Sequence, residues 1–366
     1  MIEAIADKVF TGQRLTYDDG LRLFQHPNLP ELGMLADEVR WRKHPDAVVT
    51  YNIGRNINYT NVCWVRCKFC AFYRPPGHEE GYTLPDEEIF RKVEALIAVG
   101  GSDEPDSCEI LMQGGLNPRL KIDYYERLFS EITRRYPAAY LHSLSVAEIV
   151  YLAQISKVSV EEALIRLRAA GLKSLPGAGA EVLDDEVRDA IAYRKESARE
   201  WLDVHRLAHQ IGMNSTATMM FGSVETIVHR LKHILLVRDA QDQALAGAGG
   251  HFTAFISWSF QPEGTELPGT RKATGYDYLR TTAVARLLLD NIDNIQASYV
   301  TQGPKIAQIA LRYGVNDFGS TMMEENVISA GGVSFVMPTN EIERIIQDAG
   351  FDPRRRNTRY EMVAHQ

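Results

Sequence analysis

The chain has 366 residues, of which 45% are hydrophobic and 24% are charged, so it is long enough to bury a large core. Its formal net charge of −8 argues against the basic surface that nucleic-acid binding requires. No window reaches the ~20 apolar residues of a membrane span, and the first residues lack the features of a signal peptide. We therefore expect a cytoplasmic protein that binds neither nucleic acid nor membrane.

The order of the predicted elements favours an α/β fold. Residues 1–45 are predicted to form a helical lead-in, residues 46–337 a barrel, and residues 338–366 a short helix and a tail packed on the barrel. From residue 46 onward, short apolar runs alternate with stretches of helical period, which is typical of parallel strands joined by crossover helices. The eight predicted strands are 48–57, 108–112, 140–144, 172–175, 214–220, 252–260, 295–299 and 315–318.

The predicted helices lie between these strands. In the first, Pro85 stands at the first turn, acidic residues follow, and Ile89, Phe90 and Val93 share one face. Repeated βα units predict a TIM-type (β/α)8 barrel, with the chemistry on the loops after the strands. Residues 241–250 are predicted to be a loop, and the basic run 354–356 a solvated tail segment rather than an anion contact at an active-site mouth. The predicted helices are 85–98, 122–135, 160–170, 184–209, 226–240 and 276–291.

Three cysteines stand close together directly after the first predicted strand. Cys63, Cys67 and Cys70 have the spacing C-x3-C-x2-C. The chain has only four cysteines, and three of them stand within eight positions, which is not the pattern of a disulfide framework in a chain of this length. Thiolates select zinc or iron-sulfur clusters, and zinc usually takes four ligands. Cys108 opens an apolar strand and is predicted to be a buried hydrophobic residue, and His78 a polar loop residue. Three ligands without a fourth predict a cluster with one iron open for catalysis.

The cysteine loop resembles the signature of the radical S-adenosylmethionine (SAM) superfamily, in which C-x3-C-x-aromatic-C follows the first barrel strand. The resemblance implies a [4Fe-4S] cluster whose open iron is chelated by SAM, with Phe69 or Tyr73 near the adenine. It also implies a glycine-containing turn beneath the methionine amino group. The turn Gln113-Gly114-Gly115, after the second predicted strand, stands at that place.

Polar residues after other strands complete the predicted site. Glu181, in the segment LPGAGAE at 175–181, is predicted to bind the ribose or ammonium group of SAM, or else to compensate the charge of a helix N-terminus. His142 and Ser143 end the third strand and face either the barrel mouth or a helix cap. Trp258 and Gln261 lie at the end of the sixth strand, where they could stack on and hydrogen-bond an aromatic substrate. His205 and His209, at i and i+4, lack the Glu base of a zinc protease and are interpreted as ordinary helix-face histidines.

Over residues 51–360 the chain resembles the dehypoxanthine futalosine cyclases, also called cyclic dehypoxanthinyl futalosine synthases. Their relatives are the aminofutalosine synthases and the deazaflavin synthase subunits, which share the cysteine loop. Two segments of this chain favour the cyclases instead: QGGLNP at 113–118 and the strand end FQP at 260–262. Ala178 replaces a common glycine. The resemblance is carried by NINYTNVCWVRCKFCAFYR at 56–74, LMQGGLNP at 111–118, LHSLSVAEI at 141–149, LPGAGAE at 175–181, STATMMFG at 215–222 and FISWSFQPEGT at 255–265.

This resemblance implies a role in menaquinone biosynthesis by the futalosine pathway. The deoxyadenosyl radical would remove the hydrogen from C4′ of the ribose of dehypoxanthine futalosine, and the carbon radical would then add to the benzoate ring. Tyr59, His142 and Glu181 are candidates for the base that removes the last proton, and Arg74 for the partner of the benzoate carboxylate. An external one-electron reductant, such as flavodoxin or ferredoxin, is implied as a partner. The alternatives are an aminofutalosine synthase and a non-enzymatic three-cysteine metal protein.

Overall fold

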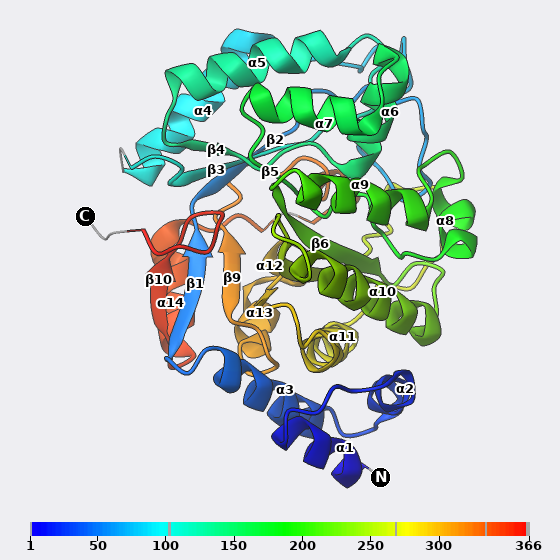
Figure 1. Cartoon of the computed structure of the whole chain (residues 1–366), viewed down its shortest axis with the longest axis vertical. Coiled ribbons are helices and arrows are strands. Elements are labelled where there is room, and N and C mark those ends of the chain that lie inside the picture. The colour runs from blue at the N-terminus through cyan, green and yellow to red at the C-terminus, as the bar shows by residue number, and fades with distance from the viewer. Residues whose placement is uncertain (1, 102–103, 268, 334, 364–366) are drawn as a thin grey trace.

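The computed structural model describes residues 2–101, 104–267, 269–333 and 335–363 (Figure 1). Every paired strand runs parallel to its neighbour. The strands are β1 (Val48–Asn52), β2 (Gly54–Ile57), β3 (Cys108–Met112), β4 (Ala139–Leu141), β5 (Ser174–Leu175), β6 (Asn214–Phe221), β7 (Phe252–Ser259), β8 (Asn294–Gln296), β9 (Asp317–Ser320) and β10 (Asp352–Arg355). None of the described helices has the length and apolar character to cross a bilayer.

The strands form a (β/α) barrel whose pairing is divided between two sheets. One sheet has the order β10-β1-β9-β8-β7-β6-β5 and the other the order β2-β3-β4. Two links join the sheets: β1 continues into β2 through Ile53, and a bridge pairs His142, directly after β4, with Ser174 at the start of β5. The barrel prediction is therefore confirmed. The predicted strand 48–57 is divided because its first half pairs with β9 and β10, whereas its second half pairs with β3.

The helices cover the outside of the barrel, and β1 to β9 enclose its interior (Figure 1). Capping boxes fix several helix starts, as at Ser145, whose side chain accepts from the backbone N–H of Glu148. The helices are α4 (Asp86–Gly100), α5 (Ile122–Arg135), α6 (Val146–Ser156), α7 (Val160–Ala169), α8 (Asp185–Ala192), α9 (Ala198–Gln210), α10 (Ile227–Leu245), α11 (Gly275–Leu288), α12 (Tyr299–Gln302), α13 (Pro304–Ala310) and α14 (Thr339–Asp348).

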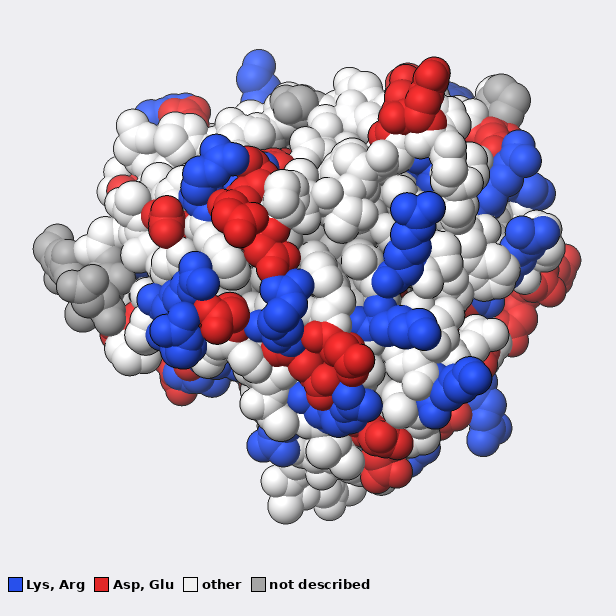
Figure 2. Space-filling model, turned by 90° about the horizontal axis from the view of Figure 1, so that it is seen from above, with Lys and Arg blue, Asp and Glu red and all other residues white. Residues whose placement is uncertain are grey.

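The N-terminal lead-in consists of three helices, α1 (Ile2–Phe10), α2 (Tyr17–Gln25) and α3 (Leu29–Lys43). They pack on one another and on the outer helices, α3 on α11 and α2 on both α10 and α11 (Figure 1). On the face shown in Figure 2, acidic and basic side chains are interspersed rather than gathered into one basic area.

Two predictions about helices and loops were wrong, and one helix was missed. Residues 184–209 form two helices, because Ser197 begins α9 with its own capping box to Glu200. Helix α10 continues to Leu245, so the first half of the predicted loop 241–250 is helical. Helix α6 was not among the predicted helices, although Ser145 and Glu148 carry its start signal.

The interpretation of the basic run 354–356 as a solvated segment was wrong for Arg355 and Arg356, because residues 352–355 form strand β10 alongside β1. The sequence did not indicate this strand, because Pro353 lacks the backbone N–H that a strand residue usually donates. The strand lies at the edge of its sheet, where a residue without an N–H is tolerated. Arg356, predicted to be solvated, is only 3% exposed and forms a buried ion pair with Asp317. The tail is therefore part of the barrel interior.

Candidate active site

The loop after β2 gathers the three cysteines at the carboxyl end of the strands. Backbone bonds shape it: the N–H of Cys63 donates to the carbonyl of Arg74 at 2.8 Å, and that of Cys70 to the carbonyl of Cys67 at 3.1 Å. Cys63 is buried, and Cys67 and Cys70 are half-buried. Burial raises the pKa of each thiol, and the nearby ammonium of Lys195 opposes that rise. All three thiols thus share one electrostatic environment.

The three cysteine thiols are candidate ligands either for a zinc ion or for an iron-sulfur cluster. A tetrahedral zinc with Zn–S bonds of about 2.3 Å needs sulfurs ~3.8 Å apart. Among the described residues, the possible ligand atoms of Asp184, Glu186 and His229 lie within 4.8 Å of one another, but the three cysteine sulfurs do not. Three soft thiolates on one short loop suit a cluster of several irons.

The Gln113-Gly114-Gly115 turn packs directly under the cysteine loop. The N–H of Gly115 donates to the carbonyl of Thr60 at 2.8 Å, and a Cβ on Gly115 would lie 2.3 Å from the carbonyl oxygen of Val62. The turn was predicted to let a backbone approach a ligand closely. In the structure the backbone that Gly115 approaches belongs to the cysteine loop itself, while Gln113 lines the barrel cavity.

A buried carboxylate, Glu148, ties the turn to the cysteine loop. Its Oε1 accepts from the N–H of Gly114 at 2.9 Å and from the hydroxyl of Tyr59 at 2.7 Å, and its Oε2 accepts from the N–H and hydroxyl of Ser145. Burial raises the pKa of Glu148 and also that of Tyr59. Tyr59 is fully buried in this network, outside the cavity, so the structure does not bring this candidate base to the site.

Three other predicted residues also lie outside the cavity. The Ser143 hydroxyl donates to the carbonyl of Ile110 at 3.0 Å and accepts from a backbone N–H, so it holds strands together. Arg74 pairs with Glu80 at 2.6 Å instead of facing a substrate carboxylate. The Tyr73 hydroxyl donates to Glu266 at 3.1 Å near the surface. The sequence predicted their position on the right loops, but the direction of each side chain depends on tertiary partners.

A cavity of about 320 Å³ occupies the barrel interior. Five predicted residues line it: Phe69, Gln113, His142, Glu181 and Trp258. A smaller adjoining cavity of about 60 Å³ contains Cys70, Phe69, Trp258 and Gln261, so it connects the cysteine loop to the larger space. The amide of Gln261 donates to the carbonyl of Ser259 at 2.9 Å. The structure therefore brings seven of the fifteen predicted site residues to these two adjoining cavities.

Comparison with known proteins agrees with this geometry. The family model of the radical SAM superfamily matches residues 57–237, and the model described as the CofH/MqnC C-terminal region matches residues 249–366. The cyclic dehypoxanthine futalosine synthase of Halalkalibacterium halodurans is 45% identical over 362 residues, which cover 99% of this chain and 95% of that protein. The chain belongs to the CofH/MqnC family of radical SAM enzymes.

Other relatives extend the comparison. The cyclic dehypoxanthine futalosine synthase of Streptomyces coelicolor is 42% identical, over 100% of this chain and 90% of that protein. The aminodeoxyfutalosine synthase of the same organism is 35% identical, over 98% of this chain and 93% of that protein. The crystal structure of methylornithine synthase has a TM-score of 0.70 at 18% identity, covering 95% of this chain and 96% of that one. This last likeness concerns the fold alone.

Enzymes of the radical SAM superfamily use a [4Fe-4S] cluster and SAM, and the residues around the cysteines fit both groups. Glu181, with φ of +43°, forms an ion pair with the ammonium of Lys195, which also lies 5.5 Å from the ring centre of Phe69. Burial acts to lower the pKa of Lys195, but Glu181 and Glu196 outweigh it and leave that pKa raised. Lys195 stands before α9, distant in sequence from the cysteines, so no local pattern indicated it.

Sequence reasoning also missed most of the polar lining of the radical SAM cavity. These residues belong to no sequence motif. Alternate side chains of a strand face the same side, and only this alternation could have indicated that Thr216 and Thr218 point into the barrel. Arg356, Thr358 and Tyr360 come from the C-terminal tail. The missed polar residues are Asn56, Glu109, Thr216, Thr218, Gln296, Ser298, Ser320, Glu325, Arg356, Thr358 and Tyr360.

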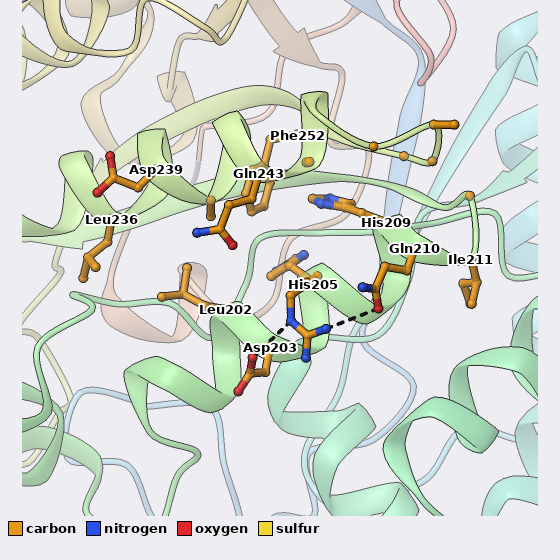
Figure 3. Close-up of a pocket in the computed structure, with 18 residues that line it drawn as sticks. Leu202, Asp203, His205, His209, Gln210, Ile211, Leu236, Asp239, Gln243 and Phe252 are labelled. Atoms are coloured by element: carbon orange, nitrogen blue, oxygen red, sulfur yellow. Dashed lines mark hydrogen bonds and ion pairs between the residues drawn. The ribbon is translucent and has the colours of Figure 1, made fainter.

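A larger hollow, of about 870 Å³, lies between α9 and α10 (Figure 3). Gly212 and Gly250, which border it, precede β6 and β7, so it is at the opposite end of these strands from the cysteine loop. His205 and His209 reach it from α9; His209 contacts the Ser215 hydroxyl at 2.8 Å. The hollow contains none of the residues predicted for catalysis, and the prediction that both histidines lie on a helix face agrees with their place on α9.

Proposed function

We propose that this radical SAM enzyme is a dehypoxanthine futalosine cyclase acting in menaquinone biosynthesis by the futalosine pathway. The observation that carries the proposal is the full-length similarity, 45% and 42% identity, to two cyclic dehypoxanthine futalosine synthases. The aminodeoxyfutalosine synthase of Streptomyces coelicolor, the alternative function, is 35% identical. A non-enzymatic zinc protein is disfavoured because the family model of the radical SAM superfamily matches residues 57–237, which include all three cysteines.

Cys63, Cys67 and Cys70 would hold the cluster. Phe69, Gln113 and Glu181 would contact SAM from the cavity wall, and Gly114 and Gly115 would hold the wall in place. When bound, the cluster and SAM supply a 5′-deoxyadenosyl radical, which removes the hydrogen from C4′ of the substrate ribose. The support for this assignment is that Phe69 lines both cavities, between the cysteines and the barrel interior. Enclosing these groups within the barrel would exclude water from the reactive centre.

His142 would act as the base that removes the proton when the radical formed on the benzoate ring loses one proton and one electron and regains its aromaticity; the oxidised cluster would supply the acceptor for that electron. It lines the cavity, and its Nδ1 lies 2.6 Å from the Ser174 hydroxyl, which fixes the ring. Burial lowers the pKa of His142, so the imidazole is neutral and able to accept a proton. A weak base suffices for this step because the return of aromaticity drives the loss of the proton.

The electron would come from an external donor such as flavodoxin or ferredoxin in the cytoplasm. Cys67 and Cys70 are only half-buried, so the proposed cluster site lies close to the surface that such a donor would meet. Trp258 would pack on the aromatic part of the substrate, since it lines both cavities.

The experiment is an anaerobic incubation of the reconstituted, reduced protein with dehypoxanthine futalosine and SAM. We expect 5′-deoxyadenosine and a product two hydrogens lighter than the substrate, both detected by mass spectrometry. A protein that leaves this substrate unchanged but joins SAM to an enolpyruvyl benzoate is instead an aminofutalosine synthase. A colourless protein that binds one zinc refutes both.

A further inference from the structure

The wall of the barrel cavity holds a carboxylate that the described residues leave without a partner. Three glutamates line the cavity. Glu181 pairs with Lys195, and Glu325 accepts from the N–H groups of three residues that follow it. Glu109, in contrast, forms no hydrogen bond or ion pair with another described residue. Its charge is therefore free to act on a neighbouring group.

Strand β3 directs Glu109 into the cavity. Along this strand Cys108, Ile110 and Met112 are buried, whereas Glu109 and Leu111 are partly exposed and line the cavity. The strand pairs with β2 on one side and with β4 on the other, and helix α4 packs against it. The exposed part of Glu109 therefore opens into the barrel interior rather than to the outer surface.

His142 is a diagonal neighbour of Glu109 on the inner face of the barrel. Glu109 pairs with Tyr140 of β4, and His142 follows two residues later, on the same face of the chain. The N–H of His142 donates to the carbonyl of Ile110 at 3.0 Å, so the pairing continues past the end of β4. Diagonal neighbours on adjacent strands lie about 7–8 Å apart. The two side chains are thus close enough to interact through their charges.

Three charged or titratable groups among the described residues face His142: Glu109 from β3, Arg356 from the segment after β10, and His205 from α9. His205 is neutral, because burial holds its pKa well below the usual value. Arg356 disfavours a second cation, but its Nε and Nη2 donate to Asp317, whose carboxylate balances its charge. Burial lowers the pKa of His142, and Glu109 acts against that fall. The Glu109 charge is thus the one that favours a proton on His142.

A protonated His142 is a cation inside the barrel, where burial makes a charge costly. This cation forms during the proposed reaction: the C–H bond of the ring radical breaks, its proton joins Nε2 of His142, since Nδ1 faces Ser174, and the electron passes to the oxidised cluster. We propose that the Glu109 carboxylate stabilises the protonated imidazole of His142, so that Glu109 is a positioning residue for the removal of the proton. This inference rests on the proposed cyclase function and names the partner of its base.

The test uses Glu109→Gln, which removes the charge and keeps the shape of the side chain. NMR of isotope-labelled histidine in the reconstituted, oxygen-free enzyme would follow the protonation of His142 against pH, with His142→Gln identifying its signal. Coulomb's law at about 8 Å, with an effective dielectric constant of about 20–40, gives a proton affinity of His142 that falls about 5- to 30-fold in Glu109→Gln. The variant should also yield less cyclised product for each 5′-deoxyadenosine released, because fewer ring radicals lose their proton.

Two control variants separate the charge of Glu109 from its shape and from the charge of the whole cavity. Glu109→Asp retains the carboxylate, so the titration of His142 should stay close to that of the wild type. Glu325→Gln removes a carboxylate from the same cavity, but Glu325 is not among the groups that act on His142, so the titration should not change. Glu109→Gln should melt close to the wild-type temperature, because no described residue bonds its carboxylate.

The outcomes distinguish this inference from the proposed function. If the wild type cyclises dehypoxanthine futalosine but His142 titrates in Glu109→Gln as in the wild type, the inference about Glu109 is overturned alone. A wild-type ratio of cyclised product to 5′-deoxyadenosine in Glu109→Gln overturns it as well. If the wild type makes no cyclised product, the proposed function fails, and the titration still decides whether Glu109 stabilises the protonated imidazole.

Discussion

Gly115→Ala offers a direct test of how the turn supports the cysteine loop. The added Cβ would lie 2.3 Å from the carbonyl oxygen of Val62, 2.7 Å from its carbonyl carbon and 2.9 Å from the Cβ of Cys63. All three are closer than a real Cβ approaches a neighbour, and two of them are backbone atoms that a rotamer change cannot move. Overpacking of this kind costs about 1–3 kcal/mol. Losing the bond from the N–H of Gly115 to Thr60 adds about 0.5–1.5 kcal/mol.

We expect Gly115→Ala to fold with lower stability and to lose most of its iron, because the clash moves Cys63 relative to Cys67 and Cys70. Anaerobic iron and sulfide analysis, a visible spectrum and a urea titration would measure both effects. Gly247→Ala is the matched control, since a Cβ there meets only the carbonyl of Ala244 at 3.4 Å. A Gly115→Ala protein with wild-type iron content and wild-type SAM cleavage would refute the argument that this contact positions Cys63.

Three further predictions concern the cluster, the buried histidines and the buried ion pair between Arg356 and Asp317. Cys67→Ser should abolish the visible absorption of the cluster and the release of 5′-deoxyadenosine while far-UV circular dichroism stays unchanged; retained SAM cleavage would show that the ligand assignment is wrong. Burial lowers the pKa of His209 to about 4 and of His233 to about 3, below the ~6.5 of an unfolded histidine, so the unfolded chain binds more protons below pH 6.5. Stability should be complete above pH 6.5 and fall by up to ~1.4 kcal/mol per pH unit for each histidine toward pH 4, a slope that chemical denaturation at several pH values measures and that His233→Gln should reduce. Arg356→Met should cost about 3–5 kcal/mol of unfolding free energy, since it leaves Asp317 buried without its cation, and Asp317→Asn in the same chain should recover part of that loss. Equal stability of the single and double variants would contradict this account of the pair.

The sequence by itself determined the features that depend on neighbours along the chain. Residues 108–112 and 122–135 were predicted with the bounds of β3 and α5, because apolar spacing and turn signals act within a few residues. The three cysteines lie on one loop after one strand, so their spacing alone indicated a cluster. Phe69, Gln113, His142, Glu181 and Trp258 reach the cavity because the ends of parallel strands meet there.

The tertiary structure decided what depends on residues distant in the sequence. Tyr59 is a reactive-looking side chain beside the cysteines, yet Tyr125 and Glu148 hold its hydroxyl outside the cavity. The tail looks solvated as a sequence, yet pairing of β10 with β1 carries Arg356 to Asp317 and brings Tyr360 into the cavity wall. A charged residue is buried only where a partner compensates its charge. When that partner is distant in the sequence, the residues next to the charge do not indicate it.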